Sequence, residues 1–198
     1  MSYTAGDVVL AERGYIYFAV GTASSVPAVA PTIPADPAAN PTVPTGWVGV
    51  GSVSADTPIT IGRTQDDPTA LPTWAAPSGI RITAPAVKWN LQFGVLDQTQ
   101  LALDLYFGAG GDADDGSYAV TRTSSGTPSY GALYVHFLDG AHADGKLGLY
   151  VPKVSVIGSD DLAFDTDALN VKPVTATILD AGGLNNLFEW VDTAVVVP

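Results

Sequence analysis

Two histidines are the residues of this chain best suited to catalysis or metal binding. His136 lies within the apolar run 133–138, whereas His142 lies in a turn rich in glycine and aspartate. Their spacing suggests no third ligand, so a zinc site is not indicated. The chain has no Gly-x-Ser-x-Gly elbow, and neither histidine has the setting of a catalytic triad. We therefore expect no enzyme activity, no metal site and no cofactor, with His136 on the polar face of a strand.

The acidic loop at residues 110–116 invites comparison with a calcium-binding loop. An EF-hand counted from Asp112 needs an oxygen ligand at its fifth position and a glutamate at its twelfth, where this chain has Gly116 and Thr123. The motif therefore fails. We predict a solvated turn, with an irregular Ca²⁺ site as the alternative.

The composition points to a surface that packs against neighbours. Of 198 residues only 14% are charged, against about 25% in an average soluble domain, so small uncharged residues must cover much of the surface. The net charge of -12 excludes a protein that grips nucleic acid, which needs clustered lysine and arginine. Such a surface could still line a conduit through which DNA slides.

The absence of cysteine excludes disulfides, thiolate metal sites and cysteine nucleophiles. Neither a signal peptide nor a membrane-spanning run of about 20 apolar residues is indicated. We therefore expect a protein made in a cytoplasm, with no membrane partner.

The order of elements predicts a mainly β fold: a β-sandwich or barrel-like sheet with one short flanking helix, in a single domain over residues 1–198. Residues 87–95 alternate most clearly, with Trp89, Leu91 and Phe93 on the core face. Asp97 is the predicted N-cap of a helix at 98–106, whose Leu101 and Leu105 face the sheet. The full set of expected strands is 15–20, 46–54, 58–62, 80–96, 117–123, 132–138, 146–157, 172–179 and 187–197. An irregular stretch is expected at 64–79.

A proline-rich segment interrupts this pattern at residues 22–46. Its prolines recur every three or four residues, which excludes a helix or a central strand. Its apolar residues argue against simple solvation, so we interpret it as an extended arm that contacts another subunit; a flexible linker is the alternative. The candidate contacts are Val26, Val29, Ile33 and Val43, and residues 190–198 form a second candidate arm.

Several segments, in order, resemble the major tail tube proteins of long flexible-tailed (siphovirus-type) phages, particularly those infecting actinobacteria. The resemblance covers about residues 46–180 and is carried by the stretches 46–51, 57–61, 87–93, 97–99, 103–108 and 171–179, together with Trp74. It implies six copies in a ring, with inner strands joined into a continuous barrel and rings stacked into a tube. Ring closure would pair exposed sheet edges, and head-to-tail stacking would grow a filament.

The resemblance also implies a function and partners. The tube would conduct DNA during ejection, with an acidic lumen that keeps DNA moving by repulsion. Lys88, Asn90 and Gln92 form the candidate lumen face, although Lys88 departs from an acidic wall. The implied partners are further copies of the chain and the tape measure, terminator and distal tail proteins, in a virion tail assembled in the host cytoplasm.

Two other classes remain open. The chain could be another phage particle subunit, such as a tail terminator or a capsid decoration protein. It could instead be a secreted carbohydrate-binding or adhesin sandwich, in which Trp47, Trp74 and Trp89 stack on sugars; the simpler interpretation of these tryptophans is core or interface packing.

Overall fold

A computed structural model describes residues 13–23, 46–73, 76–83, 85–114, 116–138, 146–164, 169–182 and 186–192. Its strands are β1 (Arg13–Val20), β2 (Val48–Gly49), β3 (Thr60–Thr64), β4 (Thr69–Thr73), β5 (Ala76–Thr83), β6 (Lys88–Val95), β7 (Asp112–Asp114), β8 (Ser117–Ala119), β9 (Ser129–Leu138), β10 (Lys146–Gly158), β11 (Lys172–Ile178) and β12 (Glu189–Asp192), with the helix α1 at Gln100–Phe107. Eight strands form one antiparallel sheet in the order β2-β1-β9-β10-β11-β6-β3, and β12 pairs with β10.

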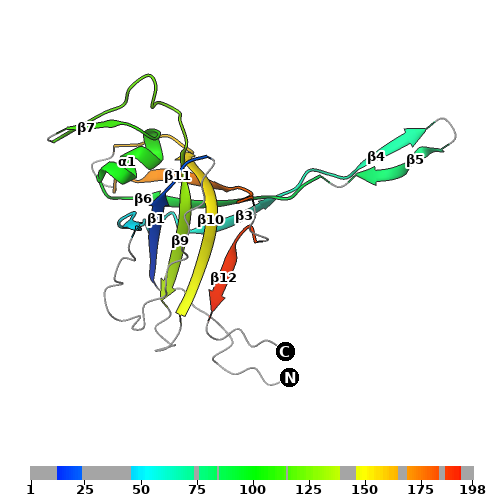
Figure 1. Ribbon diagram of the computed structural model, residues 1–198, viewed down its shortest axis with the longest axis horizontal. Helices are drawn as coiled ribbons and strands as arrows, with labels where there is room; N and C mark the ends of the chain where they lie inside the picture. The colour runs from blue at the N-terminus through cyan, green and yellow to red at the C-terminus, as the bar shows by residue number, and fades with distance from the viewer. Residues whose placement is uncertain are drawn as a thin grey trace.

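The longest strand, β10, divides this sheet into two layers. On one side it pairs with β9 in both halves, whereas on the other side its first half pairs with β12 and its second half pairs with β11. The register with β9 shifts between Val151 and Val154, and such a bulge bends a strand and increases its twist. As a result β1, β9, β10 and β12 lie roughly along one axis, and β6, β11 and β3 cross them (Figure 1).

Residues 50–54 link the two layers on a second side. The Val50 N–H donates to the Ile16 carbonyl of β1 at 2.8 Å, and the Ser54 N–H donates to the Gly94 carbonyl of β6 at 2.9 Å. Val53 also bridges to Val95. The sandwich therefore has a barrel-like closure on this side.

The main core lies between the layers and consists of the alternate residues of each strand. Leu91, Phe93 and Val95 of β6 are fully buried there, as predicted from the alternation, and Trp89 packs against them. The other buried members are Ile16, Phe18, Val50, Ala102, Leu105, Leu133, Val135, Leu149, Val151, Val154, Val156, Val174, Ala176 and Ile178.

Helix α1 packs on the core through Ala102 and Leu105, which are both buried, with Leu101 half-buried beside them. The prediction that Asp97 caps this helix is wrong. Thr99 is the N-cap, and its hydroxyl accepts a hydrogen bond from the Ala102 N–H at 3.2 Å. A threonine next to the first turn can reach this N–H, whereas Asp97 lies two residues too early.

The mainly β class is confirmed, with two corrections between residues 64 and 96. The single strand predicted at 80–96 is two strands, because β5 ends at Thr83 and β6 begins at Lys88. The stretch predicted to be irregular contains β4, which pairs with β5. Prolines at 72 and 77 suggested irregular structure, but both strands of an isolated hairpin are edge strands, where proline is tolerated.

Gly51→Ala should destabilise the fold by about 1–3 kcal/mol. Residue 51 has a φ of 103°, and a β-carbon there would collide with the Asp97 carboxylate. Gly49→Ala is the matched control, since a β-carbon at 49 meets nothing within 4 Å. Urea denaturation of both variants measures the difference. Equal midpoints would contradict the strain argument.

Candidate assembly surfaces

The outward face of the β3–β6–β11 layer carries polar side chains in rows that cross several strands. One row runs through Gly62, Asn90, Thr177, Ser155 and Tyr130, from β3 to β9. A second row contains Thr60, Gln92, Thr175 and Ile157. Paired residues point to the same side of a sheet, so these rows form one surface, here called the polar face.

Of the candidate lumen residues, Asn90 and Gln92 belong to these rows, and Lys88 extends the polar face by a further pair with Thr64 of β3. Lys88 and Gln92 are exposed and Asn90 is half-buried. The Asn90 amide lies over Gly62, at the place a β-carbon would occupy. The two rows contain hydroxyl and amide groups and no carboxylate. The sequence identified the β6 members of this face through their alternation, but it could not identify the partners that β3, β10 and β11 contribute.

The hairpin of β4 and β5 projects far from the body of the molecule (Figure 1). Its strands pair with each other from Thr69–Thr83 to Thr73–Ala76, with a register shift between Leu71 and Thr73. An isolated two-stranded hairpin is only marginally stable in water. This hairpin therefore has the form of an element that packs on another molecule, and the sequence-based analysis missed it.

A second buried cluster, mainly aromatic, covers the face of β1, β9 and β10 that is opposite the main core. Tyr17, Trp47, Tyr134 and Tyr150 are buried there, with Trp47 set edge-on to Tyr150 at 6.2 Å. His136 shares this face, opposite the main core, but it is only 1% exposed, so it is buried rather than solvated. Its Nδ1 lies 3.4 Å from the Tyr134 hydroxyl, and burial lowers its pKa, which favours the neutral imidazole.

The acidic loop forms the small hairpin of β7 and β8, which is fastened to α1. The Asp104 carboxylate accepts hydrogen bonds from the Tyr118 hydroxyl at 2.7 Å and the Gly111 N–H at 3.2 Å. Burial, together with this hydrogen bond, raises the pKa of Tyr118. In the part of the chain that the structure describes, no three His, Cys, Asp or Glu side chains are grouped to hold a metal ion.

One lysine is fully buried at the junction of β6, α1 and β11. The Lys172 ammonium donates to the Asp97 carbonyl at 3.0 Å and the Leu96 carbonyl at 3.5 Å. Burial lowers the pKa of Lys172, while the charge of Asp97 opposes that shift. These bonds tie the start of the helical segment to β11, which is a structural role.

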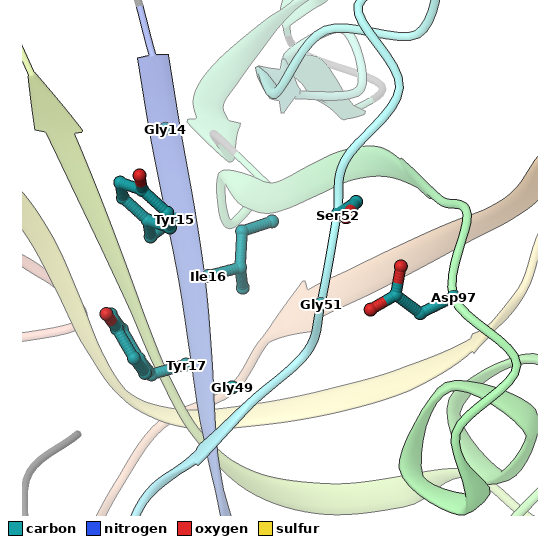
Figure 2. Close-up of a pocket in the computed structure, with 8 residues that line it drawn as sticks. All are labelled: Gly14, Tyr15, Ile16, Tyr17, Gly49, Gly51, Ser52 and Asp97. Carbon is teal, nitrogen blue, oxygen red and sulfur yellow. The ribbon is translucent and has the colours of Figure 1, made fainter. Parts of the chain in front are cut away.

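A slot of about 360 Å³ opens beside the start of β1 (Figure 2). Its lining includes Gly14, Gly49, Gly51 and Ser52. The Asp97 carboxylate points towards Gly51, whereas Tyr15 and Tyr17 point away from that segment. The slot is lined by one carboxylate, from Asp97, and by the hydroxyl of Ser52, with no histidine or cysteine among its lining residues.

The proposed arms fall largely outside the described residues. Val26, Val29, Ile33 and Val43 all lie there, as do residues 193–198 and Trp74. Residues 190–192, the start of the second candidate arm, belong to β12.

A comparison with known protein families decides the class of the molecule. The family described as phage tail tube protein matches residues 1–198. The chain belongs to the phage tail tube proteins. No curated protein matches it at a significant level.

Membership of this family makes the chain a structural component of the virion tail, which assembles with other tail components. The mainly β sandwich with one short helix is consistent with that role. Among the described residues, no helix has the length and apolar character needed to cross a lipid bilayer.

Tyr134→Phe should reduce the loss of stability of this tail tube protein at alkaline pH. Burial raises the pKa of Tyr134 from 10.0 to about 12, so its neutral form is favoured in the folded state. The stabilisation of the folded state that goes with this raised pKa is complete below pH 10. It amounts to about 3 kcal/mol at most and is lost as the pH rises towards 12. Free energies of unfolding between pH 8 and 11.5 should therefore fall less steeply in the variant. Tyr130→Phe is the control, and identical slopes for all three proteins would contradict the prediction.

Proposed function

We propose that this protein forms hexameric rings that stack into the tail tube of a long flexible-tailed phage, and that the tube conducts DNA into the host. The observation that carries this proposal is the β4–β5 hairpin in a chain that belongs to the tail tube family. A hairpin that protrudes in this way gains stability by packing on a neighbour. A neighbouring copy in a stack would provide that surface.

The polar face is the proposed wall of the lumen. Its Thr, Ser, Asn and Gln side chains present no extended apolar surface to which a passing polymer would adhere. Lys88 is its one cation in β6, and the two described rows contain no acid. Under this proposal the lumen wall is closer to neutral than the net charge of the chain suggests. DNA then passes because the wall binds it only weakly, not because the wall repels it strongly.

The finer assignments belong to the same proposal. The resemblance to tail tube proteins of actinobacterial phages supports such a host, and it supports assembly in the host cytoplasm with tape measure, terminator and distal tail proteins as partners. A terminator or capsid decoration protein would form finite assemblies instead. The burial of Trp47 and the packing of Trp89 against Phe188 at 5.3 Å disfavour a sugar-binding surface on these tryptophans.

The purified protein should assemble into rings or tubes about 100 Å wide, the width expected for six domains of this size around a pore. Negative-stain electron microscopy over a concentration series is the test. Closed rings that never stack would favour a terminator. Monomers at every concentration and ionic strength would overturn the proposal.

Removal of the β4–β5 hairpin should abolish tube growth while the body still folds. Thr64 and Lys88 are paired neighbours on β3 and β6, so Asn-Gly in place of residues 65–87 can join them as a tight turn. Circular dichroism and thermal melting should show a folded protein, and electron microscopy should show no stacked tubes. Normal tubes from this variant would show that the hairpin is not a stacking element.

A control lengthens the turn of the other hairpin. The connection at residues 115–116 between β7 and β8 can be lengthened by two glycines without changing the body or the β4–β5 hairpin. Tubes should still form from this variant. A loss of tubes in both variants would show that assembly is sensitive to any change at the periphery.

A further inference from the structure

The layer of β1, β9, β10 and β12 carries a row of aromatic side chains on the side opposite the main core. Tyr17 pairs with Tyr134, and Tyr134 pairs with Tyr150. The rings of Tyr17 and Tyr134 are stacked at 6.2 Å, and Tyr15 and Tyr17 point to the same side of β1 (Figure 2). The surface here called the aromatic face consists of Tyr15, Tyr17, Ala19, Ala132, Tyr134, His136 and Tyr150.

This aromatic face is buried along β9, although it lies outside the main core. His136 is 1% exposed and Ala132 is 0% exposed. The two residues are four apart on one strand, so their α-carbons are separated by roughly 13 Å. Within the described part of the chain, Trp47 is the one member of the cluster that lies outside the strands, and its ring is set against Tyr150 at 6.2 Å. One indole cannot cover both His136 and Ala132, so their burial requires a further segment on this face.

The ends of residues 24–45 are placed to supply that segment. The chain leaves the layer at the end of β1 and returns at Trp47, which is buried on the aromatic face. Val48 then pairs with Phe18 of β1. The intervening segment therefore begins and ends beside the same strand, and its second end is already fixed against the aromatic rings.

The composition of residues 24–45 suits an aromatic surface. Six prolines recur in this segment every three or four residues, and Asp36 is its one charged residue. Such sequences favour the polyproline II conformation, which leaves its backbone carbonyls without internal partners. Grooves lined by aromatic side chains recognise these segments. The rings pack on proline, and tyrosine hydroxyls and the indole N–H can donate to the free carbonyls.

We propose that residues 24–45 dock on the aromatic face of their own subunit as a polyproline II segment. The layer spans three strand spacings from β1 to β12, roughly 14 Å, which about five residues in this conformation cross at about 3.1 Å each. The segment is long enough to cross the face and return to Trp47.

The occupant is the same chain rather than a second copy, because the aromatic face is already buried within a single chain. Under this proposal the apolar residues of the segment, interpreted above as contacts to a neighbouring subunit, pack on their own sheet. The contact lies within one subunit, so the inference goes beyond the proposed ring and tube and does not depend on them.

A photo-crosslinking probe tests the contact in the full-length protein. Tyr15→p-benzoylphenylalanine places the probe at a half-buried position of the aromatic face. Chymotrypsin, which cuts after Tyr17 and Trp47, separates the probe from residues 24–45. Irradiation of mixed unlabelled and ¹⁵N-labelled protein, followed by mass spectrometry, identifies both the linked segment and the copy that carries it.

The main cross-link should join the probe to residues 24–45 of the same copy. The same probe in place of Gln92, on the polar face, is the matched control and should give no cross-link to this segment. Cross-links to residues 1–12, cross-links to another copy, or no cross-link to residues 24–45 would each overturn the inference and leave the proposed tube standing.

A replacement variant gives a second measurement. A glycine–serine linker of equal length in place of residues 24–45 keeps the connection to β2 and removes the prolines. The synthetic peptide of residues 24–45 should bind this variant and change its tryptophan fluorescence. It should bind the wild type at least about tenfold more weakly, because the tethered segment competes at an effective concentration in the millimolar range.

A peptide with its six prolines replaced by serine is the control and should bind neither protein. A folded replacement variant that binds the proline-rich peptide no better than the wild type does would overturn the inference. The cross-link decides the matter if the replacement variant does not fold. Electron microscopy of the wild type tests the tube separately, so failure of one proposal is distinguishable from failure of the other.

Discussion

The bend in β10 is the constraint on which the rest of the structure depends. A strand of 13 residues that kept one register would extend a single flat layer, and one side of that layer would expose its apolar residues. β9 follows β10 across the shift near Pro152, but on the other side the first half of β10 pairs with β12 and the second half pairs with β11. The two layers can then cross and bury one common core, with α1 and residues 50–54 covering further sides. The polar face follows from this arrangement.

Much of the fold could be predicted from local pattern, because a half-buried strand shows its alternation in the sequence. β6 is the clearest case, since Leu91, Phe93 and Val95 are buried and Lys88 and Gln92 are exposed. The family membership also agrees with the resemblance inferred from short segments. What could not be predicted depends on pairing between distant segments: the rows of the polar face, the bend in β10, and the hairpin whose prolines resembled a loop signal. The N-cap of α1 was predicted two residues too early, at Asp97 instead of Thr99, because aspartate and threonine are both favourable N-cap residues.

The distribution of chemistry is consistent with a structural protein. The histidine expected on a polar strand face is buried against Tyr134, and the acidic loop is occupied by its attachment to α1 through Asp104. The buried Lys172 is bonded to backbone carbonyls rather than directed at a cavity. Groups that could have served catalysis in another setting here hold one element against another.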